Sequence, residues 1–161
     1  MRRLRYCVAH PLAGRYNYLL RSSMKEEIEK TTILMAQLNK ACSLHNSREY
    51  FASITLAGCA ESLSEELLAS KDEESYNSFF ESVIRKLAEI RGKNSPSKRD
   101  ILRGKNRVRN SFKHHSKGDS YTITLDMKHE SLILIMSALE NYSRLGFEQT
   151  PVMERFVKRN R

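Results

Sequence analysis

Apolar residues recur at alternating spacings of three and four along most of this 161-residue chain. That spacing places them on one face of an α-helix and is incompatible with strands, whose side chains alternate every two residues. The first such stripe consists of Met24, Ile28, Thr31, Met35, Leu38 and Cys42. Polar, Gly and Pro residues separate it from the stripes that follow. The pattern predicts an all-α fold, a mainly up-and-down bundle of five or six helices.

Capping signals mark the expected helix boundaries. Helices are expected to start after Ser23, Ser47, about Ser75, Ser97, Asp126 and Thr150. The second helix carries a run of small residues at 57–60, which would allow a neighbour to approach closely. The fourth helix is expected to end near Ser116, with Gly118 in a left-handed conformation. Residues 120–125 alternate like a strand but have no partner, so we expect a short extended segment packed on the bundle before the penultimate helix.

The composition excludes several classes of protein. Hydrophobic residues make up 40% and charged residues 29% of the chain, which is typical of a soluble globular protein. No uncharged apolar run approaches the roughly 18 residues of a membrane span, so we expect no membrane association. The three cysteines are odd in number and lack C-x-x-C spacing, which argues against disulfides and zinc and favours the cytoplasm. We expect neither a metal nor a cofactor.

Charge is distributed unevenly along the chain. The formal net charge is +9, and residues 91–117 alone contain ten Lys and Arg against a single acid, Asp100. Residues 61–81 are predominantly acidic. The basic segment could be neutralised within the fold by this acidic segment, or it could bind an anionic partner such as nucleic acid.

The N-terminal 21 residues contain five Arg and no acid. We interpret residues 1–21 as a basic, flexible N-terminal arm and residues 22–161 as a single helical-bundle domain. The arm could bind nucleic acid, act as a transit peptide or have no role.

The basic helix contains the residues best suited to chemistry. Asn106, Asn110 and His114 recur every four residues and form a polar stripe opposite the apolar face. Arg109 and Lys113 lie on the flank between the two. A cationic His near a helix C-terminus can transfer a proton, and an Arg can stabilise a phosphate in the transition state. RNA supplies its own nucleophile, so such a site needs no metal.

At these residues the sequence resembles the HEPN superfamily (higher eukaryotes and prokaryotes nucleotide-binding). The run from Arg109 to His114 is similar to its signature, an Arg followed by a polar residue and, after a short spacer, by His. His115 also fits that spacing, and we prefer His114 because it lies on the polar stripe. Residues 54–61 and 138–156 resemble small bacterial HEPN-like proteins, so the resemblance covers about residues 24–158.

The resemblance implies a homodimer that acts on RNA as a metal-independent endoribonuclease of toxin, defence or RNA-processing type. Arg109 and His114 would be catalytic, and Asn110, Glu61 or His115 would orient them. Nucleic acid would bind to Arg103, Asn106, Arg107, Lys113 and Lys117. Other family members bind nucleotides or an antitoxin-like partner without turnover, so a non-catalytic nucleic-acid-binding or protein-interaction dimer is the alternative. Arg109 could equally form only an ion pair with Glu61 or Glu65.

Overall fold

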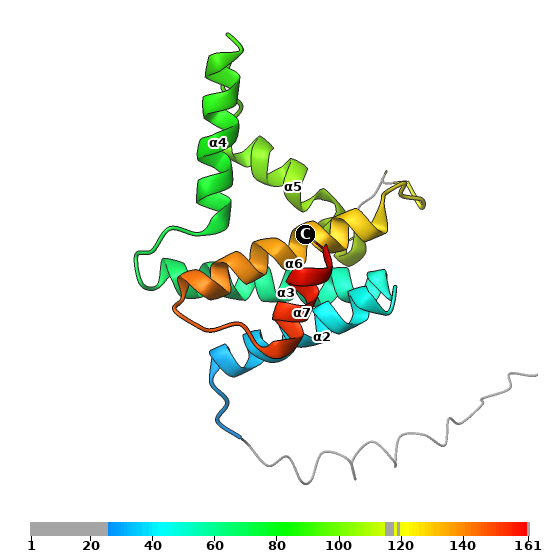
Figure 1. The fold of residues 1–161 in the computed structure, drawn as a ribbon. Coiled ribbons are helices and arrows are strands. Elements are labelled where there is room, and N and C mark those ends of the chain that lie inside the picture. Colours follow the sequence, from blue (N-terminus) through cyan, green and yellow to red (C-terminus); the bar gives the residue numbers. More distant parts are fainter. Residues whose placement is uncertain (1–25, 115–117, 119, 161) are drawn as a thin grey trace, which may run out of the picture.

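The computed structural model describes residues 26–114, 118 and 120–160. Within these residues the chain forms six α-helices and no strand, which confirms the predicted all-α bundle (Figure 1). The helices are α2 (Lys30–Asn46), α3 (Tyr50–Ala69), α4 (Tyr76–Ile90), α5 (Lys98–Lys113), α6 (Met127–Arg144) and α7 (Pro151–Asn160). The arm at 1–21 lies outside the described residues.

The core lies between α2, α3, α6 and α7. Helix α3 packs against α6 on one side and against α2 on the other, and α7 packs on α2. Fully buried side chains come from all four helices, including Leu38, Ile54, Ile135 and Phe156. Their burial from water is the main stabilising contribution to a bundle of this kind.

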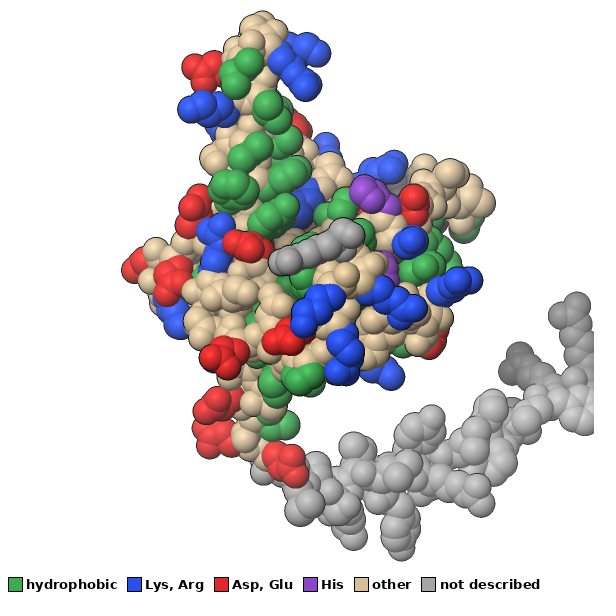
Figure 2. Space-filling view, in the orientation of Figure 1, with side chains coloured by type: hydrophobic (Ala, Val, Ile, Leu, Met, Phe, Trp, Pro, Cys, Tyr) green, Lys and Arg blue, Asp and Glu red, His purple; other side chains and the backbone are tan. Residues whose placement is uncertain are grey.

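Helices α4 and α5 form a hairpin that projects from this core (Figure 1). In α4 only Asn77 is buried, and the apolar side chains Phe79, Val83, Leu87 and Ile90 are all more than a third exposed. Figure 2 shows these apolar side chains gathered along the length of α4. Helix α5 returns to the bundle and buries Ile101 and Val108.

Four of the expected helix starts have a side-chain cap, and the first is Ser75, whose Oγ accepts a hydrogen bond from the backbone N–H of Ser78 at 3.3 Å. The Ser97 side chain accepts a hydrogen bond from the backbone N–H of Asp100 at 3.2 Å, and Asp126 accepts one from His129 at 3.0 Å. Thr150 accepts a longer one from Met153 before Pro151 opens α7. Each bond satisfies a backbone donor that has no partner inside its helix.

The start of the bundle differs from the prediction. Helix α2 begins at Lys30 and not directly after Ser23, since residues 26–29 are not helical. Ser23 itself lies outside the described residues. Ser47 is the C-cap of α2, whereas Glu49 precedes α3. Arg48 adopts a left-handed conformation with φ of 65°, and its N–H bonds to the carbonyl of His45. Ser47, the residue expected to cap α3, therefore ends α2 instead.

The segment before α6 is also less closely packed than expected. Residues 120–125 form neither helix nor strand, and Tyr121 is 95% exposed. Only Leu125 at its end packs against the core. Helix α5 ends at Lys113 rather than near Ser116, and Gly118 has the expected positive φ of 96°.

A buried polar chain connects α2, α3 and α6. His45 Nδ1 lies 2.9 Å from Ser131 Oγ, which lies 2.7 Å from Ser53 Oγ, and Ser53 donates to the carbonyl of Ala41. Because Ser53 uses its only proton on Ala41, Ser131 must donate to Ser53, and His45 must donate from Nδ1. Burial of the ring, followed by the positive charge of Lys128, lowers the pKa of His45 below its ordinary value of 6.5.

This lowered pKa predicts that the fold loses stability on acidification. Above about pH 6.5 the His45 ring is neutral in both states, and below it the unfolded chain binds the proton more readily. The His45 contribution to the free energy of unfolding, measured by urea denaturation, should therefore be lower at about pH 5.5 than at about pH 7.5. His45→Gln should lose this difference, whereas His129→Gln, at an exposed position, should keep it. An unchanged difference in His45→Gln would contradict the prediction.

Candidate functional site

Helix α5 divides its basic residues between two faces. Arg99, Arg103 and Arg107 are exposed, and they lie on one side of the helix with Asn110 and His114, within about 80° of one another. We call these five residues the outer row. Lys105 and Arg109 face the bundle, where their side chains are only 5% and 14% exposed. Residues four apart share a face of the helix, so Arg99, Arg103 and Arg107 all meet solvent. Lys105 and Arg109 are also four apart but offset from them by two residues, and they are buried.

The two inward cations share one buried carboxylate. Glu61 in α3 is fully buried, and its Oε2 accepts a hydrogen bond from Arg109 Nη1 at 3.1 Å. Its Oε1 accepts from Lys105 Nζ at 2.5 Å and from Ser137 Oγ at 2.7 Å. The hypothesis that Arg109 pairs with an acid of the second helix is confirmed, and that acid is Glu61.

Lys105 extends this cluster to α4 and α6. Its ammonium group also donates to Asn77 Oδ1 of α4 and to Ser137 Oγ of α6, and it lies 5.0 Å from the centre of the Tyr76 ring. We call Glu61, Asn77, Lys105, Arg109 and Ser137 the buried charge cluster. It connects four helices, so it positions the projecting hairpin on the bundle.

Arg109 is held at its terminal Nη1 and packs with its stem against Gly58, whereas its buried Nε has no hydrogen-bond partner among the described residues. Its Nη1 also donates to Ser62 Oγ at 2.9 Å and to the carbonyl of Gly58 at 3.4 Å. A Cβ atom at Gly58 would lie 2.6 Å from Cδ and 2.9 Å from Cγ of Arg109, closer than side chains pack. The small residues at 57–60 do allow close approach, as predicted, and the neighbour is the Arg109 stem.

A neighbouring acid responds to this cluster. Glu65 lies one turn further along α3, and its pKa is raised, first by burial and then by the negative charge of Glu61. Lys105 and Arg109 act in the opposite direction with smaller effect. Glu65 therefore carries its negative charge less readily than an exposed Glu does.

His114 lies at the exposed end of the outer row. It follows the last residue of α5, and its backbone N–H donates to the carbonyl of Asn110 at 2.9 Å. Both side chains are exposed, as predicted, but Asn106 is half-buried, and its Oδ1 has no hydrogen-bond partner. The predicted polar stripe is therefore exposed only at its C-terminal end. His115 and Lys117 lie outside the described residues, and of Lys113 only the backbone is described.

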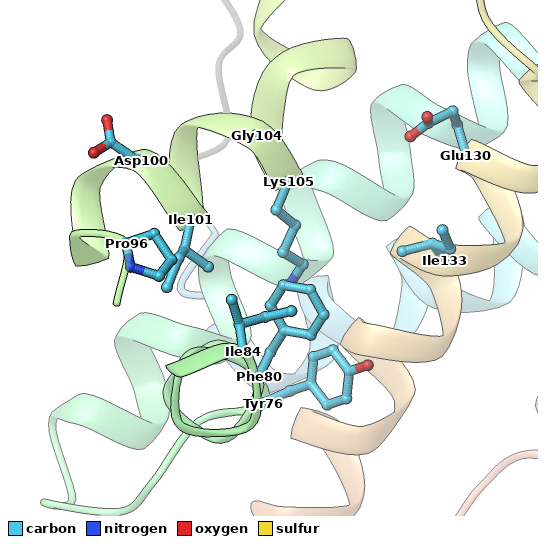
Figure 3. A pocket seen from close by; sticks show the side chains of 10 residues that line it. All are labelled: Tyr76, Phe80, Ile84, Pro96, Asp100, Ile101, Gly104, Lys105, Glu130 and Ile133. Carbon is cyan, nitrogen blue, oxygen red and sulfur yellow. The ribbon is translucent and has the colours of Figure 1, made fainter. Parts of the chain in front are cut away.

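A cavity of about 590 Å³ lies between α4, α5 and α6 (Figure 3). Tyr76, Phe80 and Ile84 of α4 and Ile101 of α5 line it, and Lys105 enters from α5. The ammonium group of Lys105 is already bonded to Glu61, Asn77 and Ser137. The cavity therefore presents a mainly apolar surface to a binding partner, with Asp100 and Glu130 as its acidic lining residues. Sequence reasoning did not identify it, because Lys105 in a basic helix is expected to be exposed.

Neither a protein-family model nor a curated protein nor a solved structure matches the chain. In the described part of the chain, no group of three His, Cys, Asp or Glu side chains could hold a metal ion. No helix there is long and apolar enough to cross a membrane.

The contact between Gly58 and Arg109 predicts an unusual response to a Gly→Ala change. Ala normally stabilises a helix interior by about 1 kcal/mol relative to Gly. Gly58→Ala should instead destabilise the protein, because displacing the Arg109 stem costs about 1–3 kcal/mol. In an Arg109→Ala background the same change should stabilise it, as judged by urea denaturation.

Gly104→Ala provides the matched control, because a Cβ there would meet nothing within 4 Å. It should be stabilising in both backgrounds. If Gly58→Ala has the same effect with and without Arg109, the close contact is not what requires glycine at this position.

Proposed function

We propose that this protein binds RNA along the outer row of α5 and cleaves it as a metal-independent, HEPN-like endoribonuclease. The observation that carries the proposal is the exposed row of three arginines that ends at Asn110 and His114. Arginines spaced one turn apart suit successive phosphates of one strand. The site would serve a toxin, defence or RNA-processing role, and an antitoxin-like protein would be a natural regulator.

The proposed chemistry needs only the chain's own residues. His114 takes the proton from a ribose 2′-hydroxyl, whose oxygen attacks the adjacent phosphorus and displaces the 5′-oxygen of the next nucleotide. The protonated His114 then gives this proton to the departing 5′-oxygen, so the products are a 2′,3′-cyclic phosphate and a 5′-hydroxyl. Arg109, held by Glu61 and Ser62, would stabilise the charge that grows on the phosphate.

Binding without turnover is the second candidate, and a specific contact favours it. All three hydrogen bonds of Arg109 to α3 are donated by Nη1, and Glu61 neutralises part of its charge. An arginine committed to a buried carboxylate is a structural anchor, and the outer row alone would then bind RNA or a nucleotide. The two candidates differ in whether the protein cleaves RNA, and the first one requires His114 for that cleavage.

We further propose that two copies pair through α4. Its apolar stripe continues across the cavity to Ile133 of α6, which is more than a third exposed. A stable interface takes about 800 Å² from each partner, so the stripe of α4 and the cavity wall would have to be covered together. A two-fold axis across α4 would let the same stripe serve both copies.

The ribonuclease proposal predicts cleavage of labelled RNA in the presence of EDTA. His114→Ala should lower the rate by roughly 10²–10⁴-fold, the usual contribution of a positioned general acid or base. His129→Ala, at an exposed position on α6, should leave it unchanged. Equal cleavage by wild type and His114→Ala would remove His114 from the chemistry, and absence of cleavage in all three would favour binding without turnover.

RNA binding by the outer row can be tested separately by salt dependence. Arg103→Gln with Arg107→Gln should weaken binding and reduce the slope of log affinity against log salt by about 1.4, or 0.7 per phosphate contact. Arg155→Gln with Arg159→Gln removes the same charge from exposed positions of α7 and should leave more of the slope intact. Equal losses in the two pairs would mean that net charge, and not the outer row, determines binding.

The proposed dimer predicts a change of mass on charging α4. Leu87→Glu with Ile90→Glu should convert the dimer to a monomer in sedimentation experiments, because charges would enter the apolar interface. These side chains are 41% and 72% exposed, so the fold should persist. Ile28→Glu, at another exposed apolar position, should stay dimeric. A monomeric wild type at micromolar concentration would contradict the proposal.

A further inference from the structure

Phe51 is exposed in a way that the packing of the bundle does not account for. It lies in the first turn of α3 and is 65% exposed, whereas neighbouring Tyr50 packs edge-on against His45. An aromatic ring held in water is costly, because its apolar surface is not buried. Single exposed apolar side chains are common on protein surfaces. Phe51 differs because it lies next to the C-terminal end of α5.

The Phe51 ring is supported by the last turn of α5. Its centre lies 5.6 Å from that of Phe112, with the ring planes inclined by 41°. Phe112 is half-buried and packs against the core, so it holds one side of the Phe51 ring in place. Phe112 also lies two residues before His114, which places this aromatic pair at the end of α5 where the outer row terminates.

Phe51 shares one face of α3 with the residues that hold Arg109. Phe51, Thr55, Gly58 and Ser62 are spaced four, three and four apart and lie within about 60° on the helix. Gly58 and Ser62 contact Arg109, and Thr55 between them and Phe51 is exposed. Phe51 lies about 10 Å along α3 from Gly58. That length corresponds to about three stacked nucleotides at 3.4 Å each.

We propose that Phe51, supported by Phe112, is a stacking platform for a base of single-stranded RNA whose backbone follows the outer row past His114. The inference rests on the proposed RNA binding and adds a contact to the bases. Exposed aromatics beside a basic track bind single strands in this way, because every base has a π-face. A duplex keeps its bases stacked inside and cannot offer one to Phe51.

The chain has no tryptophan, so Phe51→Trp introduces a single fluorophore at the platform. The probe is a single-stranded 2′-O-methyl RNA of uridines, which lacks the attacking hydroxyl and reports binding whether or not the protein cleaves RNA. Stacking of a base should quench the fluorescence of Phe51→Trp saturably. An abasic strand with the same phosphates should not quench it, and neither strand should quench Phe79→Trp on α4.

Affinity provides the second measurement. Phe51→Ala should weaken binding of the uridine strand by roughly 5- to 150-fold, the range for loss of one stacked base, and Phe51→Tyr should restore most of it. Binding of the abasic strand should be the same for all three side chains. Because Phe51 is mostly exposed, Phe51→Ala should unfold at the same denaturant concentration as wild type, which confirms that any loss is local.

The outcomes separate this inference from the proposed function. If Arg103→Gln with Arg107→Gln weakens binding but Phe51→Ala does not, the stacking platform is wrong and RNA binding by the outer row stands. Quenching by the abasic strand, or equal quenching of Phe79→Trp, also overturns the platform. If the wild type binds no strand at all, both the inference and the proposed RNA binding fail.

Discussion

The buried carboxylate of Glu61 is the interaction on which the arrangement of the hairpin depends. It bonds to Lys105, Arg109 and Ser137, and Lys105 in turn bonds to Asn77. Helices α4 and α5 bury few apolar side chains, so hydrophobic packing alone holds them weakly. Breaking a buried ion pair costs about 3–5 kcal/mol, because the remaining charge has no partner and no water. The orientation of α5 is therefore determined largely by charge.

This requirement explains why α5 is basic on both sides. The inward cations satisfy Glu61, and the outward arginines make no ion pair with the part of the chain that the structure describes. Part of the basic segment is thus neutralised inside the fold, by one acid of the acidic segment, while the outer row is left to solvent. The first interpretation of the charge pattern, neutralisation within the fold, therefore applies to the inner face of α5, and the outer face is the one to which we propose that RNA binds.

Much of the fold follows from the sequence, because helical periodicity and caps are local signals. Ser97, Asp126 and Thr150 cap helices as their spacing predicts, and the Arg109–Glu61 pair was one of two foreseen. Periodicity identifies an apolar face without identifying what covers it, so the exposed stripe of α4 could not be foreseen. No local signal marks Lys105 as a buried residue of the basic helix, because its three acceptors come from residues 28 to 44 positions away in the chain.

The charge balance of the cluster bears on how Arg109 can act. Glu61 offers one negative charge to two cations, Lys105 and Arg109. Because the pKa of Glu65 is raised, this second acid carries a negative charge less readily and balances the remaining positive charge less well. The buried charge cluster therefore retains an excess positive charge on the side of α3 that α5 covers. A field held in a partly buried site acts more strongly on a phosphate than the same charge in water. Under the proposed ribonuclease function, Arg109 would be fixed by Glu61 and would still carry charge toward a bound phosphate, which is the condition that separates a catalytic arginine from a purely structural one.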